Sequence, residues 1–324
     1  MNPVKHAALA AYYWGSLPMR RRRAATRRRR GVEPVSILFY HRVADTHPNG
    51  WTMPCKTFAW QIEWIAKRFD VVSLAEAQRR IASGTNARPT VCITFDDGYA
   101  DNCEFALPLL LRKRLPVTYF VATDNLRTGT PFPHDVAAGV KLRPNSVEEV
   151  RAMAGAGVEI GAHTRTHADL GRVVDHDRLV SELAGSKHDL EQTLGRAVRY
   201  FAFPFGLHEN LSPEAFRVAR LAGLAGVCSA YGAYNTPGDD PFHLKRIHAD
   251  PQRLRLKNWL TVDPRKLRVP DFDPGDLDAD PRPADQGPAG RGASGENLAA
   301  ASDDMGPCTL VTAQDGPSAV EVPD

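Results

Sequence analysis

Residues 90–98 read Thr-Val-Cys-Ile-Thr-Phe-Asp-Asp-Gly, an apolar and β-branched run that ends abruptly in two carboxylates and a glycine. Such a run predicts a buried strand, and Gly98 predicts a turn after it. An Asp-Asp-Gly turn is also common in surface loops. Here the preceding run places Asp96 and Asp97 at the mouth of a buried strand, where the two carboxylates can take different roles.

Similar runs recur on both sides of this stretch, between Val35 and Val269, and alternate with amphipathic segments. The strand candidates are Val35–Tyr40, Val71–Ser73, Thr90–Phe95, Val117–Ala122, Val158–Ala162, Tyr200–Phe203, Gly226–Ala230 and Leu244–Ile247. The helix candidates are Lys56–Arg68, Leu74–Ser83, Asn102–Arg114, Ser146–Ala154, Asp175–Gly195, Ser212–Ala222 and Pro251–Leu260. This alternation predicts a distorted (β/α) barrel of the TIM type, with a doubly wound open sheet as the alternative. Without a glycine-rich phosphate loop, a nucleotide cofactor has no support.

Polar residues follow three further predicted strands, at the end of a barrel where reactive groups gather. The segments are Tyr40-His41-Arg42, His163-Thr164-Arg165-Thr166-His167 and Phe203-Pro204-Phe205-Gly206. His163 and His167 are four residues apart, so a helical turn would bring them to one face. Two histidines and one carboxylate make a common open site for a divalent metal, although a lone histidine pair is more often polar surface.

Together these residues resemble the polysaccharide deacetylases, the NodB-homology domains of carbohydrate esterase family 4. Residues 94–98 resemble the first family motif, and residues 163–167 resemble the second, H-[ST]-x-x-H. Ser181-Glu182-Leu183 and Phe201-Ala202-Phe203-Pro204-Phe205-Gly206 are similar to the third. The resemblance covers roughly residues 35–269 and implies a distorted barrel of about seven strands.

The resemblance also implies roles for individual residues. Asp96 would be the general base. A divalent metal would be held by Asp97, His163 and His167, and the backbone N–H of Phe205 would help to stabilise the oxyanion. Zinc is the expected metal, with cobalt, nickel or iron also compatible with this ligand set.

Two departures from the family pattern concern the residues beside the base. The late segment Leu244-Lys245-Arg246-Ile247-His248 matches the family's Leu-x-His motif poorly. The early segment 37–43 resembles a permuted branch of the family, which makes His41 the expected general acid and His248 the alternative. Ala202 stands where many members carry an arginine, so we expect Arg246 to supply that charge to Asp96.

These assignments predict metal-dependent hydrolytic deacetylation of N-acetylated sugars in a polysaccharide, an oligosaccharide or a glycan precursor. Two alternatives remain at this stage. One is a metal-independent hydrolase of a small cyclic amide on the same fold, which an intact metal set opposes. The other is a non-catalytic glycan-binding protein, which the retained Asp96 and His41 oppose.

The net charge of +3 conceals three blocks. Residues 1–34 carry eight arginines and Lys5 against Glu33, a charge of +8, and residues 270–324 carry twelve acids against two arginines, a charge of −10. The block 35–269 keeps +5 and forms the predicted single domain. The tail, with eight prolines and seven glycines, is predicted to be disordered.

The arginine-rich arm of residues 1–34 predicts contact with an anionic membrane surface rather than with nucleic acid, with a solvated disordered arm as the alternative. Its apolar run 7–17 is too short to span a bilayer, and the arginines follow the run where an export signal would have them precede it. The pattern predicts a cytoplasmic protein, with export as the alternative. Five scattered cysteines predict neither a disulfide framework nor a cysteine metal site.

Overall fold

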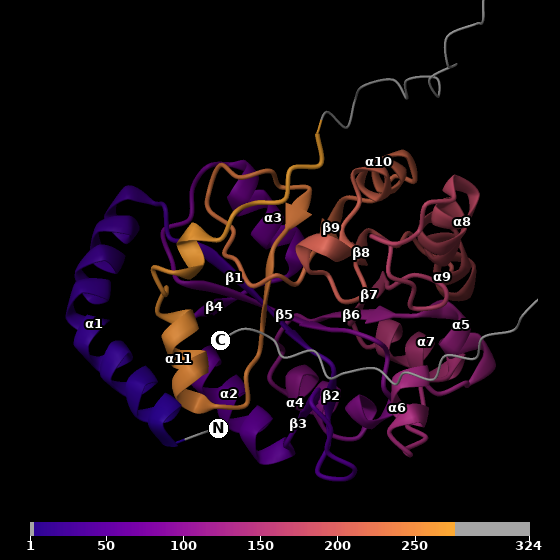
Figure 1. The fold of residues 1–324 in the computed structure, drawn as a ribbon, viewed down its shortest axis with the longest axis horizontal. Helices are drawn as coiled ribbons and strands as arrows, with labels where there is room; N and C mark the ends of the chain where they lie inside the picture. The colour runs from indigo at the N-terminus through magenta and orange to yellow at the C-terminus, as the bar shows by residue number, and fades with distance from the viewer. Residues whose placement is uncertain (1–2, 276–324) are drawn as a thin grey trace, which may run out of the picture. The chain divides into compact units, whose positions relative to one another are not determined.

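The computed structural model describes residues 3–275, and its centre is a barrel of seven parallel strands (Figure 1). The barrel strands are β1 (Val35–Tyr40), β5 (Thr90–Phe95), β6 (Thr118–Val121), β7 (Glu159–Ala162), β8 (Tyr200–Ala202), β9 (Gly226–Cys228) and the split pair β10 (His243–Leu244) and β11 (Arg246–His248). They lie in the sheet in their order along the chain. The predicted barrel of about seven strands is therefore confirmed, and the open doubly wound sheet is not formed.

The last strand closes the barrel by pairing with a different neighbour at each end. Its first half, β10, pairs with β9, whereas its second half, β11, pairs with β1. Between them, Lys245 exchanges two hydrogen bonds of 2.8 Å with the side-chain amide of Asn235. The Asn235 backbone in turn exchanges hydrogen bonds of 2.8 and 3.1 Å with Val35 at the start of β1. The buried Asn235 thus bridges the seam where the barrel closes.

Inward-facing side chains fill the barrel. The strand members of this cluster are Val35, Ile37, Cys92, Phe120, Tyr200, Ala202, Cys228 and Leu244. β7 contributes Gly161 beside Phe120, and a Cβ atom there would lie 2.4 Å from the Phe120 ring, so only a glycine leaves room for it. Helix α3 (Leu74–Ala82) packs on the same cluster and closes the end where the strands begin, because Gln78 bonds the carbonyl groups of Ala225 and Pro241 just before β9 and β10.

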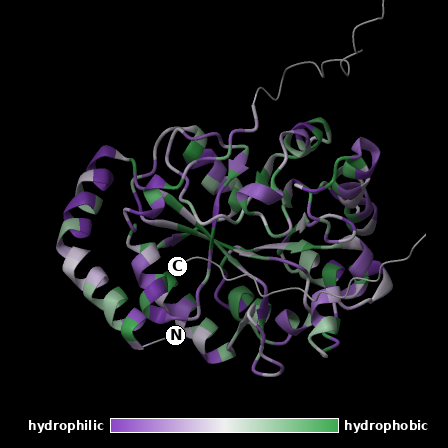
Figure 2. Cartoon of the chain, viewed as in Figure 1, coloured by the Kyte–Doolittle hydropathy of each residue, from purple (hydrophilic) through white to green (hydrophobic). Residues whose placement is uncertain are grey.

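Amphipathic helices cover the outer face of the barrel, and hydrophobic residues concentrate along the central strands (Figure 2). These helices are α2 (Cys55–Ala66), α4 (Ala106–Arg112), α7 (Val147–Gly155), α8 (His176–Val180), α9 (Ser186–Leu194) and α10 (Pro213–Leu221). α2 lies within the predicted helix Lys56–Arg68 apart from its first residue, and it buries Phe58, Ile62 and Ile65. α10 begins as predicted, with the Ser212 hydroxyl accepting from a backbone N–H and Pro213 in its first turn.

The arginine-rich arm is a helix, so the alternative of a disordered arm is wrong. Helix α1 (Pro3–Arg30) lies beside α11 (Arg253–Leu260) (Figure 1). Three side chains on one face of α1 are buried: Tyr13, Leu17 and Arg20. Tyr12 donates a 2.8 Å hydrogen bond to Asp263, and Arg20 donates one of 2.9 Å to the carbonyl oxygen of Asn258. These polar contacts hold α1 although its arginines repel one another.

Smaller differences from the sequence prediction occur where helices break. The predicted helix Asn102–Arg114 is a 3-10 turn (Ala100–Cys103) followed by α4, and the predicted helix Asp175–Gly195 is interrupted by a π-helical turn, Ser181–Gly185. The elements that were not predicted are α1, α5 (Thr123–Thr128), α6 (Pro133–Ala137) and the short pair β2 (Arg42–Val43) and β3 (Thr52–Met53). β4 (Asp70–Val71) pairs with β5 in parallel. Two further 3-10 turns lie at His208–Asn210 and Lys266–Arg268.

Two sequence predictions concern the ends and the cysteines. The tail predicted to be disordered lies outside the described residues from 276 onward, as does Cys308. The four described cysteines are free thiols. None of the helices within residues 3–275 combines the length and the apolar character that crossing a bilayer requires.

Candidate active site

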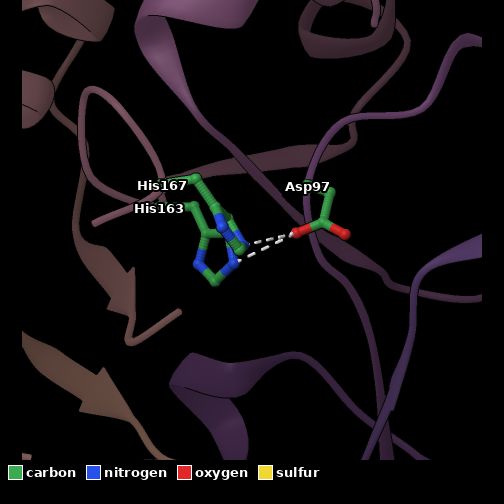
Figure 3. Close-up of side chains that lie close together, drawn as sticks. All are labelled: Asp97, His163 and His167. Atoms are coloured by element: carbon green, nitrogen blue, oxygen red, sulfur yellow. Dashed lines mark ion pairs between the residues drawn. The ribbon is translucent and has the colours of Figure 1, made fainter. Parts of the chain in front are cut away.

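The three predicted metal ligands, Asp97, His163 and His167, meet at the end of the barrel where the strands finish (Figure 3). The Oδ1 atom of Asp97, after β5, lies 3.3 Å from Nε2 of His163 and 3.1 Å from Nε2 of His167. Asp97 and His163 are buried, and His167 is slightly exposed.

The loop after β7 is fixed so that both imidazoles present Nε2 to Asp97. His163 Nδ1 lies 2.8 Å from the carbonyl oxygen of Ala202, an acceptor that requires the proton on Nδ1 and leaves Nε2 with a lone pair. Glu182, buried in the π-helical turn, accepts hydrogen bonds of 3.0 Å from the backbone N–H groups of Arg165 and Thr166 and one of 2.6 Å from the Thr166 hydroxyl. Glu182 therefore anchors the segment between the histidines.

The chemistry of these three donors fits a divalent metal. Neither imidazole meets Asp97 in hydrogen-bond geometry, so Oδ1 is buried without a donor. The buried Asp97 Oδ1 and the lone pair of His163 Nε2 face each other with His167 Nε2 beside them, and a cation between these three atoms would satisfy them. Ligands about 2.0–2.1 Å from a tetrahedral zinc lie roughly 3.3 Å apart, which agrees with the separations of 3.1 and 3.3 Å.

The backbone around this cluster adopts conformations that side chains rarely take. Asp97, Thr164, His167 and Phe205 all have positive φ angles, between 58° and 72°. Each such residue costs of order 1 kcal/mol or more, and strain of this kind persists where the surrounding structure enforces it. Gly98, with φ of 92°, lies so close to β6 that a Cβ atom would be 3.0 Å from Val121. The turn after β5 therefore needs this glycine.

Asp96 forms a buried, two-pronged ion pair with Arg246. The two guanidinium nitrogens lie 2.6 and 2.9 Å from the two carboxylate oxygens. Arg246 also bonds the Thr94 hydroxyl and the carbonyl oxygen of Ser229, and its plane lies over the Phe39 and Phe120 rings. Burial acts against the charge, yet Asp96 raises the pKa of Arg246 above its ordinary value. Arg246 thus contacts Asp96, as we expected of a residue that takes the place of the arginine that many family members carry at position 202.

The two candidate acids, His41 and His248, lie side by side because β1 pairs with β11. Their ring centroids are 6.3 Å apart, and the half-exposed Trp51 contacts both rings. Burial lowers the pKa of each imidazole, that of His248 to about 4. The carboxylates of Asp97 and Asp96 act on His41, and that of Asp96 also acts on His248. His41 also has a buried Nδ1 atom without a partner among the described residues.

Phe205 and the segment after β6 form the rim of the site. The Phe205 ring is 56% exposed and packs edge-on against His167. Its backbone N–H donates to no acceptor within the described part of the chain, so it can bind a developing oxyanion. On the other side of His167 lies the buried Phe132 ring, which leads into α6. The buried Tyr99 hydroxyl holds α6 through a 2.8 Å hydrogen bond to Asp135.

Sequence reasoning did not assign functions to Glu182, Tyr99 or Asp135. Glu182 was visible within the third-motif context, but its contact with the histidine loop depends on the π-helical turn that places it. Asp135 and Tyr99 come from segments 36 residues apart in the chain. A sequence pattern gives no local signal for such a pairing.

Comparisons with known proteins agree with this geometry. Residues 83–227 match the family model described as polysaccharide deacetylase. A Bacillus subtilis protein named "Putative polysaccharide deacetylase YxkH" is 24% identical over 67% of this chain and 72% of its own length. A chitooligosaccharide deacetylase from a Bradyrhizobium species is 29% identical over 47% of this chain and 60% of its own length.

Solved structures share the fold. IcaB from Ammonifex degensii superposes with a TM-score of 0.60 at 23% identity, over 71% of this chain and 97% of that protein. The Streptococcus pyogenes deacetylase PplD, solved in complex with acetate, superposes with the same score at 18% identity, over 71% of this chain and 98% of its own. At these identities the likeness establishes the barrel and not the substrate.

Proposed function

Residues 83–227 belong to the polysaccharide deacetylase family, and from that premise we propose that this chain is a metal-dependent hydrolase that removes acetyl groups from N-acetylated sugars of a polysaccharide, oligosaccharide or glycan precursor. The observation that carries the metal dependence is the Asp97 oxygen, which is buried without a donor and faces the Nε2 atoms of His163 and His167. Zinc suits two nitrogen ligands and one oxygen ligand, and cobalt, nickel or iron suit them as well.

Asp97, His163 and His167 would hold a divalent metal, whose Lewis acidity would polarise the amide carbonyl and make water a better nucleophile. Asp96 accepts a proton from the attacking water, and Arg246 keeps its carboxylate in place through two hydrogen bonds. The Phe205 N–H donates to the oxyanion that forms when the carbonyl carbon becomes tetrahedral.

His41 is the proposed donor of the proton that the amine nitrogen takes up as the C–N bond breaks. Two observations favour it over His248: the negative charge of Asp97 acts on His41, and its buried Nδ1 atom has no partner among the described residues. Trp51, which contacts His41 and is half exposed, offers a ring on which a sugar can stack.

The deciding experiment measures bound metal and acetate release together, using N-acetylglucosamine oligomers. We expect one zinc ion per chain, loss of zinc in the double variant His163→Ala and His167→Ala, and retention in His188→Ala, an exposed histidine on α9. Asp96→Asn should keep the metal and lose at least 100-fold in rate. Acetate release that persists after chelation would contradict metal dependence. Metal binding without acetate release from any N-acetylated glycan would favour a glycan-binding protein.

Membrane contact through α1 remains a prediction. Supporting it, Val4, Trp14 and Met19 are exposed on a helix whose last turn carries Arg27–Arg30. Vesicles with an anionic lipid should bind the chain at low salt and release it as salt rises, whereas neutral vesicles should not bind it.

A further inference from the structure

A cavity of about 550 Å³ lies between α1 and the barrel, away from the candidate active site. Its wall includes Ser36 and Thr90, which stand at the beginning of β1 and β5. Asp96 and Asp97 follow the opposite end of β5. Because five residue steps of a strand span about 17 Å, the cavity and the candidate active site are separate sites.

Cationic side chains dominate the wall of this cavity. The cations are Arg20, Arg21, Arg27, Arg28, Arg68 and Lys257. One carboxylate, Glu33, lies among them, and it pairs with Arg27 at 3.0 Å and with Arg28 at 3.3 Å. No described carboxylate pairs with the other four cations. Within residues 3–275, the wall of the cavity therefore carries a concentrated positive charge that Glu33 offsets only in part.

Two guanidinium groups in the wall have unused hydrogen-bond donors. Arg20 is 2% exposed, and its Nε and Nη1 atoms donate to Ser16 and to the carbonyl oxygen of Asn258. Its Nη2 atom is buried without an acceptor, and so is that of Arg27. A buried donor without an acceptor costs about 1–3 kcal/mol, and more when it is charged. Both guanidinium groups line the cavity, so an anion bound there would lie next to cations that the described residues leave incompletely hydrogen-bonded.

The rest of the wall determines which anion fits. Trp14, Leu17, Trp64 and Phe69 give the cavity an aromatic and aliphatic side. A phosphate monoester carries about −1.5 to −2 charges at pH 7 and three acceptor oxygens, and guanidinium groups bind phosphate through paired hydrogen bonds. We propose that this cavity binds the phosphate group of a ligand whose neighbouring part is apolar. Such a ligand is a phosphorylated amphiphile, and free phosphate shares its charged part.

The test is isothermal titration of the full chain with three probes: dihexanoyl phosphatidic acid below its micelle-forming concentration, dihexanoylglycerol and inorganic phosphate. We expect one saturable site for the phosphatidic acid and none for dihexanoylglycerol, which has the same chains without phosphate. Inorganic phosphate should bind at least 10-fold more weakly, because it lacks the apolar part. Equal affinity for inorganic phosphate would identify the ligand as free phosphate.

Two matched double variants, each of which removes two positive charges, distinguish a built site from general attraction. Arg21→Gln with Lys257→Gln removes two cations from the wall, and we expect at least 10-fold weaker binding of phosphatidic acid. Arg23→Gln with Arg29→Gln removes two exposed cations that do not line the cavity, and we expect less than a 2-fold change. Equal losses in both double variants, or no saturable binding to the unmodified chain, would overturn the proposal. Thermal unfolding without ligand checks that both variants fold.

Discussion

Substituting Arg246 by methionine should destabilise the folded protein by about 3–5 kcal/mol, because it leaves the Asp96 carboxylate buried without its cation. The side chains of Arg246 and Asp96 are 0% and 4% exposed, and both carboxylate oxygens accept hydrogen bonds from the guanidinium. Asp96→Asn should also destabilise the protein, since it leaves a buried guanidinium without its anion. The double variant contains neither charge and should be more stable than the sum of the two losses implies, by at least about 2 kcal/mol.

Urea unfolding at pH 7 with a chelator present measures this cycle without a contribution from bound metal. The matched control is the surface pair Lys113 and Glu63, which are 3.5 Å apart and 33% and 54% exposed. Its cycle, Lys113→Met with Glu63→Gln, should give a coupling energy below about 1 kcal/mol. Additive losses at Arg246 and Asp96, or a coupling no larger than in the control, would refute the reasoning that these two charges depend on each other.

Two further predictions concern other buried groups. Glu182→Gln removes a carboxylate oxygen that accepts hydrogen bonds from the loop between the two histidines, so it should weaken zinc binding about 10- to 100-fold. Competition with a chelating dye measures this affinity, and an unchanged affinity would contradict the positioning role of Glu182. Burial lowers the pKa of His243 from 6.5 to about 4, so the unfolded chain binds the extra proton and stability falls as the pH drops between these values. His243→Gln should remove up to about 3 kcal/mol of that loss at pH 4, whereas His188→Gln should not, and unfolding curves with the same pH dependence in both variants would contradict this.

The sequence predicted the barrel well because local signals and the fold agree there. Val35–Tyr40 and Thr90–Phe95 are strands with the predicted bounds, since each is a run of mostly apolar or β-branched residues that is buried on both faces. Asp96, Asp97 and His41 follow directly after these two strands, so they lie at the end of the barrel where the parallel strands finish together. His163 met Asp97 for the same reason, because β6 joins their strands in the sheet.

Features that depend on distant parts of the chain were not visible in the sequence. Helix α1 was missed as packed structure because its buried stripe, Tyr13, Leu17 and Arg20, is narrow and ends in an arginine. The stabilising partner of Arg20 is a backbone carbonyl 238 positions away, at Asn258. The division of the last strand at Lys245 likewise depends on Asn235, whose side chain replaces the missing strand partner.

The last strand of the barrel, β10 with β11, makes contacts that are distant in sequence, and the candidate active site is complete only when these contacts have formed. Asn235 and Val35 are 200 positions apart, and Arg246 and Asp96 are 150 positions apart. Contacts over such separations form late, because a long loop must close before they contribute any stability. During synthesis, β5 leaves the ribosome well before Arg246 does. Asp96 therefore has no ion-pair partner until the last strand closes the barrel. If Asp96 is the base, as proposed, folding intermediates of this chain should lack hydrolytic activity, which should then report completion of the barrel rather than formation of the sheet.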